Sequence, residues 1–101
     1  MPPALLSRRA EKDLYAAMRW IEKDNRSAAL GLIEAVHMAA ERIGEHPHIG
    51  VVRRDLTTGP HRFVALAGYP YVVVYNPDRS PPVIVRVLHG ARDIPSVLGR
   101  I

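Results

Sequence analysis

The chain has no cysteine among its 101 residues. It therefore forms no disulfide and offers no thiolate for a zinc or iron–sulfur site. Histidine is the remaining nitrogen ligand, but the five histidines lack the HExxH spacing that places two of them on one helix face. They are His37, His46, His48, His61 and His89. We therefore expect no metal and no cofactor.

Long apolar runs are also missing. No run is longer than five residues, the length of residues 63–67 and 71–75, whereas a membrane-spanning helix needs about 20. The start of the chain is unlike a secretory signal, because only two leucines precede Ser7 and the two arginines after it. We expect a cytoplasmic protein without membrane association.

Acidic residues are scarce in the second half of the chain. Residues 1–50 hold seven Lys/Arg and seven Asp/Glu, whereas residues 51–101 hold seven Lys/Arg and three Asp/Glu, so the whole net charge of +4 arises there. All seven of these cations are arginine, whose planar, permanently charged fork suits carboxylate and phosphate. The charge distribution predicts an acidic partner, either nucleic acid or an acidic protein segment.

The remaining composition is that of an ordinary globular protein, with 48% hydrophobic and 24% charged residues. A chain of this length fits one domain, which we expect to span residues 1–101. Two apolar stripes with helical spacing predict two helices in the first half. The first follows Ser7 as its N-cap and runs to about Lys23, and the second follows Ser27 and ends near Glu45. The short link between them predicts an antiparallel hairpin.

The second half changes to strand-like patterns. We predict four strands rich in β-branched and aromatic residues, joined by turns that contain Gly or Pro. They are Val51–Leu56, Arg62–Ala67, Tyr71–Asn76 and Val83–His89, and Ala4–Leu6 adds a short edge strand before the helices. Burial of both apolar surfaces then predicts an α+β fold of two layers, with the helix hairpin packed on an antiparallel sheet.

Arginine interrupts the strands at unusual places. Strict alternation along the last strand puts Ile84, Arg86 and Leu88 on one face. Because a buried unpaired guanidinium is very costly, Arg86 either pairs with a carboxylate or lines an exposed groove. Together the arginines of this half suggest a basic strip across the sheet and the C-terminal loop, although each alone is compatible with a plain solubility role. The strip comprises Arg53, Arg54, Arg62, Arg86 and Arg92.

The stretch VLHGARD ends the last predicted strand. His89 there is compatible with catalysis, but a strand-ending hydrogen bond is the commoner role of such a residue. Gly90 can supply a positive φ that turns the chain away. Tyr15 and Trp20 belong to the first helix, where they are surface or core aromatics and, if exposed, suitable anchors for a partner.

These residues resemble the RelE/ParE superfamily of type II toxin–antitoxin toxins, and most of all its ParE branch. The resemblance spans nearly the whole chain. It rests on AEKDL at 10–14, Trp20-Ile21, NRSAA at 25–29, HPHIG at 46–50, Arg62-Phe63, the strand 71–75, and VLHGARD followed by Ile94-Pro95. VLHGARD is the most specific of these motifs. Arg26 in place of a usual proline and Val51-Val52 in place of an arginine-rich turn are mild departures.

The resemblance implies a β-α-α-β-β-β fold, an antitoxin encoded in the same operon, and toxicity of the free protein. ParE-like members are reported to poison DNA gyrase, whereas RelE-like members cut messenger RNA on the ribosome. A shared scaffold does not choose between these targets.

Chemistry favours the gyrase branch. RNA cleavage needs groups that exchange protons near working pH. In RelE-like members the resemblance implies basic residues together with a tyrosine or histidine near the C-terminus, whereas residues 93–101 contain no Tyr, His or Lys. Our first hypothesis is therefore a binder that touches gyrase through its basic residues. These are Arg53, Arg54, Arg62, Arg86, His89 and Arg92. The runner-up is a ribosome-dependent endoribonuclease that uses His89 with Arg62, Arg86 and Arg92, and the third hypothesis is a degenerate, inactive binding module.

The antitoxin that the resemblance implies is predicted to be acidic and amphipathic, and to fold on binding. We expect it to lay a helix over the helix pair and to reach the basic sheet. The predicted contacts are Tyr15, Trp20, Arg62 and Arg86.

Overall fold

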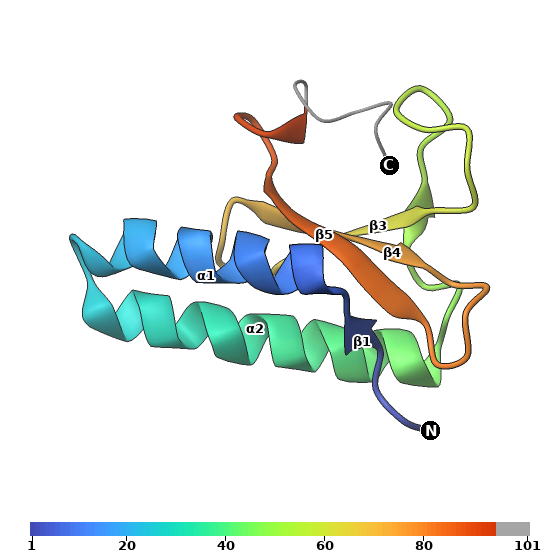
Figure 1. Ribbon diagram of the computed structural model, residues 1–101, viewed down its shortest axis with the longest axis horizontal. Coiled ribbons are helices and arrows are strands. Elements are labelled where there is room, and N and C mark those ends of the chain that lie inside the picture. The colour runs from blue at the N-terminus through green and yellow to red at the C-terminus, as the bar shows by residue number, and fades with distance from the viewer. Residues whose placement is uncertain (95–101) are drawn as a thin grey trace.

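A computed structural model describes residues 1–94 and has two layers (Figure 1). Two helices cover one face of a five-stranded sheet whose strand order is β1-β5-β4-β3-β2. In chain order the elements are β1 (Leu5–Leu6), α1 (Arg8–Glu22), α2 (Arg26–Glu45), β2 (Val51–Val52), β3 (Arg62–Ala65), β4 (Tyr71–Asn76) and β5 (Val83–His89). The predicted α+β architecture is confirmed, with four strands after the helices where the resemblance implied three.

The helices begin at side-chain caps. Ser7 is the predicted cap of α1, and its Oγ accepts a hydrogen bond from the Ala10 N–H at 3.1 Å. The predicted start of α2 is wrong by two residues, because Asn25 caps this helix in place of Ser27. Asn25 Oδ1 accepts from the Ala28 N–H at 2.9 Å, and asparagine caps a helix as well as serine does.

The sheet is mixed rather than purely antiparallel. β1 is the predicted edge strand and pairs parallel with β5, while the other neighbours pair antiparallel. The strand expected at Val51–Leu56 is much shorter. It ends after Val52 because the N–H groups of Leu56 and Thr57 both donate to the Arg53 carbonyl, at 3.0 Å each, and so form a turn.

A β-bulge in β5 changes which residues share a face. Val74 pairs with Arg86, but the next residue of β4, Tyr75, pairs with Ile84, so Val85 is an extra residue. The alternation predicted for this strand is therefore wrong. Ile84 packs in the same cluster as Val87, on the helix side, while Val85 packs against a cluster on the other face. Such a shift is what a bulge produces.

The core has two parts. The larger part lies between the helices and the sheet and contains Leu32, Val36, Ile43 and Tyr75, all fully buried. The smaller part lies on the other side of the sheet, which we call the open face, where Phe63, Val74 and Leu88 are covered by partly buried neighbours that include Leu56 and Ile94. No helix within residues 1–94 is long and apolar enough to cross a membrane.

Candidate binding site at the end of the last strand

The segment after β5 forms a compact turn, here called the 89–93 turn. Four hydrogen bonds close it: Asp93 accepts from the His89 N–H through its carboxylate at 2.8 Å, and its own N–H donates to the His89 carbonyl at 2.9 Å. The Arg92 N–H donates to His89 Nδ1 at 3.1 Å, and the Gly90 N–H donates to the Pro70 carbonyl at 2.9 Å. His89 thus has the strand-ending role that we had set beside catalysis. Pro95, the end of the sequence motif, lies outside the described residues.

Gly90 does not have the role expected of it. Among residues 1–94 the positive φ belongs to Gly68, at 82°, and to no other residue. A Cβ at Gly90 would lie 3.7 Å from the Val72 side chain, an ordinary contact. The prediction of a positive φ at Gly90 is therefore wrong, because the hydrogen bonds around His89 turn the chain instead.

Arg92 reaches from the turn to helix α1. Its guanidinium carbon lies 5.3 Å from the centre of the Trp20 ring, and its Nε lies 3.5 Å from an Asp93 oxygen. The Lys23 ammonium stands over the same indole at 4.9 Å. Trp20 is 57% exposed, so its ring is a surface aromatic that interacts with two cations.

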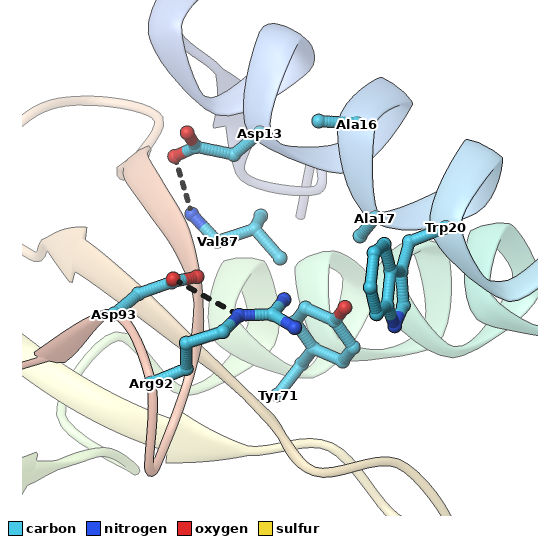
Figure 2. Close-up of a pocket in the computed structure, with 8 residues that line it drawn as sticks. All are labelled: Asp13, Ala16, Ala17, Trp20, Tyr71, Val87, Arg92 and Asp93. Atoms are coloured by element: carbon cyan, nitrogen blue, oxygen red, sulfur yellow. Dashed lines mark hydrogen bonds and ion pairs between the residues drawn. The ribbon is translucent and has the colours of Figure 1, made fainter.

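A pocket of about 270 Å³ opens between α1, β5 and this turn (Figure 2). Tyr71 projects into it from β4 with its hydroxyl between Arg92 and Trp20. The lining residues are Asp13, Ala16, Ala17, Trp20, Tyr71, Val87, Arg92 and Asp93. Two carboxylates, one guanidinium and two aromatic rings thus meet at a single opening.

Asp13 is a carboxylate of this pocket with several hydrogen bonds. It accepts from Arg86 through both oxygens, at 2.8 and 3.2 Å, and from the Val87 N–H at 3.0 Å. The side chains of Asp13 and Arg86 are only 12% and 14% exposed. Of the two alternatives for Arg86, pairing with a carboxylate is correct. Asp13 also provides the hydrogen-bond acceptor for the Val87 N–H, which lies on the edge of β5 beyond the point where β1 ends.

The other arginines of the predicted strip do not join Arg86. Arg62 pairs with Tyr75 across β3 and β4, on the helix side of the sheet, and donates to the carbonyls of His48 and Gly50 at 3.2 and 2.9 Å. Arg53 forms a two-bond ion pair with Asp55 on the surface. The prediction of one continuous basic strip is wrong, because each of these guanidinium groups has found a partner within its own neighbourhood.

Two groups near the sheet have perturbed titration. Burial raises the pKa of Tyr75, against the smaller opposing effects of its hydrogen bond with Gly50 and the charge of Arg62. Burial lowers the pKa of His61 below its ordinary value of 6.5, since an enclosed ring disfavours its charged form. Within residues 1–94 no three His, Asp or Glu side chains lie close enough together to hold a metal ion.

His61 makes stability depend on pH. A base whose pKa is lowered by folding contributes stability that is present above pH 6.5 and is lost as pH falls through its lower folded value. We therefore expect the free energy of unfolding, measured with urea, to fall below about pH 6.5. In His61→Gln the free energy of unfolding should decrease less over this pH range than in the parent. His46→Gln, at an exposed position, should show the same decrease as the parent. Identical pH profiles for His61→Gln and the parent would contradict this.

Two important residues of the pocket, Asp13 and Tyr71, were not singled out from the sequence. Asp13 had a signal, because an arginine inside an apolar strand requires a carboxylate and Asp13 belongs to the AEKDL stretch of the first helix. Tyr71 had none, since it reads as one more apolar member of a buried strand. Of the two positions left open for Tyr15 and Trp20, surface or core, the structure has them at the surface, 60% and 57% exposed.

Comparison with known proteins gives three findings. A family model described as the ParE toxin of the type II toxin–antitoxin system parDE matches residues 4–94. The predicted toxin Y4kP from Sinorhizobium fredii (strain NBRC 101917 / NGR234) is 30% identical over 90 residues, which cover 89% of this chain and 90% of that protein. A solved chain of the chromosomal ParDE system from P. aeruginosa has the same fold, with a TM-score of 0.73 at 17% identity over 88% of this chain and 96% of that one.

Proposed function

The chain belongs to the ParE toxin family of type II toxin–antitoxin systems, and from this we propose that it inhibits DNA gyrase by binding it, and that a cognate antitoxin from the same operon neutralises it. The proposal assigns no proton transfer to the chain. Its arginines hold a partner by charge and hydrogen bonding.

One observation carries the choice of a binder over a nuclease. The residues that would handle a phosphate in a ribonuclease do not gather at one place. Arg86 is engaged by Asp13 beside α1, Arg62 by two carbonyls of the 46–50 segment, and only Arg92 lies in the turn with His89. His89 Nδ1 already accepts a hydrogen bond from the backbone. A general base needs its acceptor free and within reach of the substrate.

The proposed contact with gyrase uses those of the predicted residues whose side chains are not engaged by Asp13 or by the 46–50 segment. Arg62 and Arg86 are engaged inside the protein, so we assign them to positioning. The remaining set is Arg53, Arg54, His89 and Arg92. The turn after β2, which carries Arg53 and Arg54, and the 89–93 turn both stand on the side of the sheet away from the helices (Figure 1). Leu56 and Ile94, which follow these arginines, pack on the same cluster of the open face.

The proposed antitoxin site covers the outer face of the helix pair. Tyr15 and Trp20 are exposed on α1, and Leu30 and Met38, each more than half exposed, stand on α2. Two adjoining hollows of about 330 and 380 Å³ share Leu6 and His37 in their walls. An amphipathic helix places apolar side chains in a groove of this kind. The arginine excess of residues 51–101 favours acidic residues in the part of the antitoxin that reaches the sheet.

A ribosome-dependent ribonuclease is the second candidate, and one contact favours it. The rings of Tyr71 and His89 meet edge to face, with centroids 5.3 Å apart. A tyrosine and a histidine side by side are groups that proton-transfer chemistry can use. As described above, Arg62, Arg86 and Arg92 do not converge on this pair of rings. We therefore rank this function below gyrase binding.

Induction of the chain in cells without antitoxin tests the proposal. Incorporation of labelled thymidine and of labelled methionine would be followed from the first minutes. Gyrase binding predicts that DNA synthesis falls first while protein synthesis continues. Early arrest of protein synthesis, with messenger RNA fragments, would favour the ribonuclease, and unimpaired growth would point to a degenerate toxin.

Arg92→Ala is expected to weaken target binding about tenfold or more, as removal of a central interface arginine commonly does. Its side chain is 49% exposed and its ion pair lies at the surface, so stability should change by less than about 0.5 kcal/mol. Survival after induction and urea denaturation measure the two effects. The matched control is Arg79→Ala, an exposed arginine in the turn between β4 and β5, which should kill as the parent does. Full toxicity of Arg92→Ala would remove the 89–93 turn from the target contact.

A further inference from the structure

Tyr71 carries a buried hydroxyl without a partner. The residue is only 3% exposed, and within residues 1–94 no group forms a hydrogen bond with its hydroxyl. An unsatisfied buried polar group costs about 1–3 kcal/mol. Tyr75, four residues along the same strand and facing the same core, has its hydroxyl fully used. The difference lies in the pocket, because the Tyr71 hydroxyl points into it (Figure 2).

We propose that this pocket binds a carboxylate side chain, aspartate or glutamate, from the acidic segment of the antitoxin. The Tyr71 hydroxyl and the Arg92 guanidinium donate to the carboxylate, and Trp20 packs against its methylene groups. The inference rests on the proposed function for the source of the carboxylate. It rests on the pocket itself for the chemistry.

The hydrogen-bonding capacity of the pocket selects an acceptor. Asp13 already accepts three bonds from Arg86 and Val87, and Asp93 accepts from the His89 N–H and pairs with Arg92. What the lining still offers is donation, from the Tyr71 hydroxyl and from a guanidinium that has no acceptor capacity at all. Arg92 and Tyr71 line the same pocket, and the Arg92 guanidinium lies over the Trp20 ring (Figure 2). A ligand that accepts hydrogen bonds therefore fits these donors.

Charge and shape favour a carboxylate over a phosphate. Asp13 and Asp93 line the same pocket, and their negative charges repel a phosphate dianion more strongly than a carboxylate. Ala16 and Ala17 leave room beside the indole, so that the volume of about 270 Å³ has an apolar wall as well as a polar floor. The stem of an acidic side chain can lie on that wall while its charged end reaches Tyr71.

The single tryptophan makes the test direct. In ¹⁵N-labelled full-length protein, Trp20 gives the one indole N–H signal, which reports on the pocket even for weak ligands. The probes are N-acetyl-glutamate methylamide, the matching glutamine compound, and inorganic phosphate. We expect the glutamate probe to shift the signal saturably, the glutamine probe to bind at least about tenfold more weakly because it lacks the charge, and phosphate to compete poorly.

Three variants complete the test. Tyr71→Phe removes only the hydroxyl and should weaken the glutamate probe about tenfold. Ala16→Leu fills the pocket from an exposed helix position and should abolish binding, while Arg79→Gln should leave it unchanged. An equal response to glutamate and glutamine, a stronger response to phosphate, or no response at all would each overturn the assignment. None of these results depends on gyrase, so a failure here is separable from a failure of the proposed function.

Discussion

Asp13→Ala is expected to lower the free energy of unfolding by about 3 kcal/mol. The substitution leaves the Arg86 guanidinium, 14% exposed, without its carboxylate. It also removes the acceptor of the Val87 N–H at the edge of β5. Breaking one side of a buried ion pair is costly mainly because the other charge remains buried. Urea denaturation followed by far-ultraviolet circular dichroism measures the change.

A double-mutant cycle isolates the interaction energy between Asp13 and Arg86 from the effects of their surroundings. Arg86→Ala alone should also destabilise, because it strands the Asp13 carboxylate, and the double variant should lose less than the sum of the two single losses. Asp55→Ala is the matched control. Its two-bond pair with Arg53 has the same chemistry but lies at the surface, with the two side chains 61% and 47% exposed, so we expect no measurable change. Equal effects of Asp13→Ala and Asp55→Ala would contradict the account of Asp13.

Tyr75→Phe and Tyr71→Phe are expected to have opposite effects, although both remove one hydroxyl from the same strand. The Tyr75 hydroxyl donates to the Pro47 carbonyl at 2.7 Å and accepts from the Gly50 N–H at 2.9 Å. Its loss leaves two backbone groups unsatisfied and should cost about 2 kcal/mol. Tyr71→Phe removes an unpartnered hydroxyl and should leave the free protein equally stable or slightly more stable.

Thermal and urea unfolding of the two variants, beside the parent chain, checks this contrast. A marked destabilisation by Tyr71→Phe would mean that its hydroxyl has a partner in the free protein, and the pocket would then lose its main donor. Little effect of Tyr75→Phe would mean that the 46–50 segment is not held by this side chain. Either result is distinguishable from misfolding by the cooperativity of the transition.

Much of the fold follows from local patterns. Apolar stripes at helical spacing located α1 and α2, and the β-branched runs located β4 and β5 with their observed bounds. The start of α2 was misjudged because Asn25 and Ser27 are equally good caps two residues apart, and local sequence does not rank them. The loss of strand after Val52 depends on two hydrogen bonds to the Arg53 carbonyl in the turn that follows, which propensity does not encode.

The site was harder to predict than the fold. The bulge at Val85 arises from the register between β4 and β5, a relation between two segments that neither one carries alone. It places Ile84 on the helix side, against strict alternation. The pairing of Arg86 with Asp13 joins residues 73 positions apart in the chain.

The basic strip was the main error, and its reason is physical. A count of charges gives the average field but not the partner of each cation. Arg62 donates to two carbonyls of the 46–50 segment and Arg53 pairs with Asp55 in its own turn, whereas Arg92 stands at the surface against Trp20. The family resemblance identified the toxin scaffold correctly, since the family model covers residues 4–94, and the individual role of each arginine became visible only in the folded chain.

The proposal that this toxin binds gyrase without chemistry of its own is tested most directly by trapped cleavage complexes. Purified chain would be mixed with gyrase, ATP and supercoiled plasmid, and in parallel with ribosomes and messenger RNA. The account predicts that linear plasmid with covalently attached gyrase accumulates after denaturation, less so with Arg92→Ala, while the messenger stays intact. Cleaved messenger together with gyrase that turns over normally would contradict it.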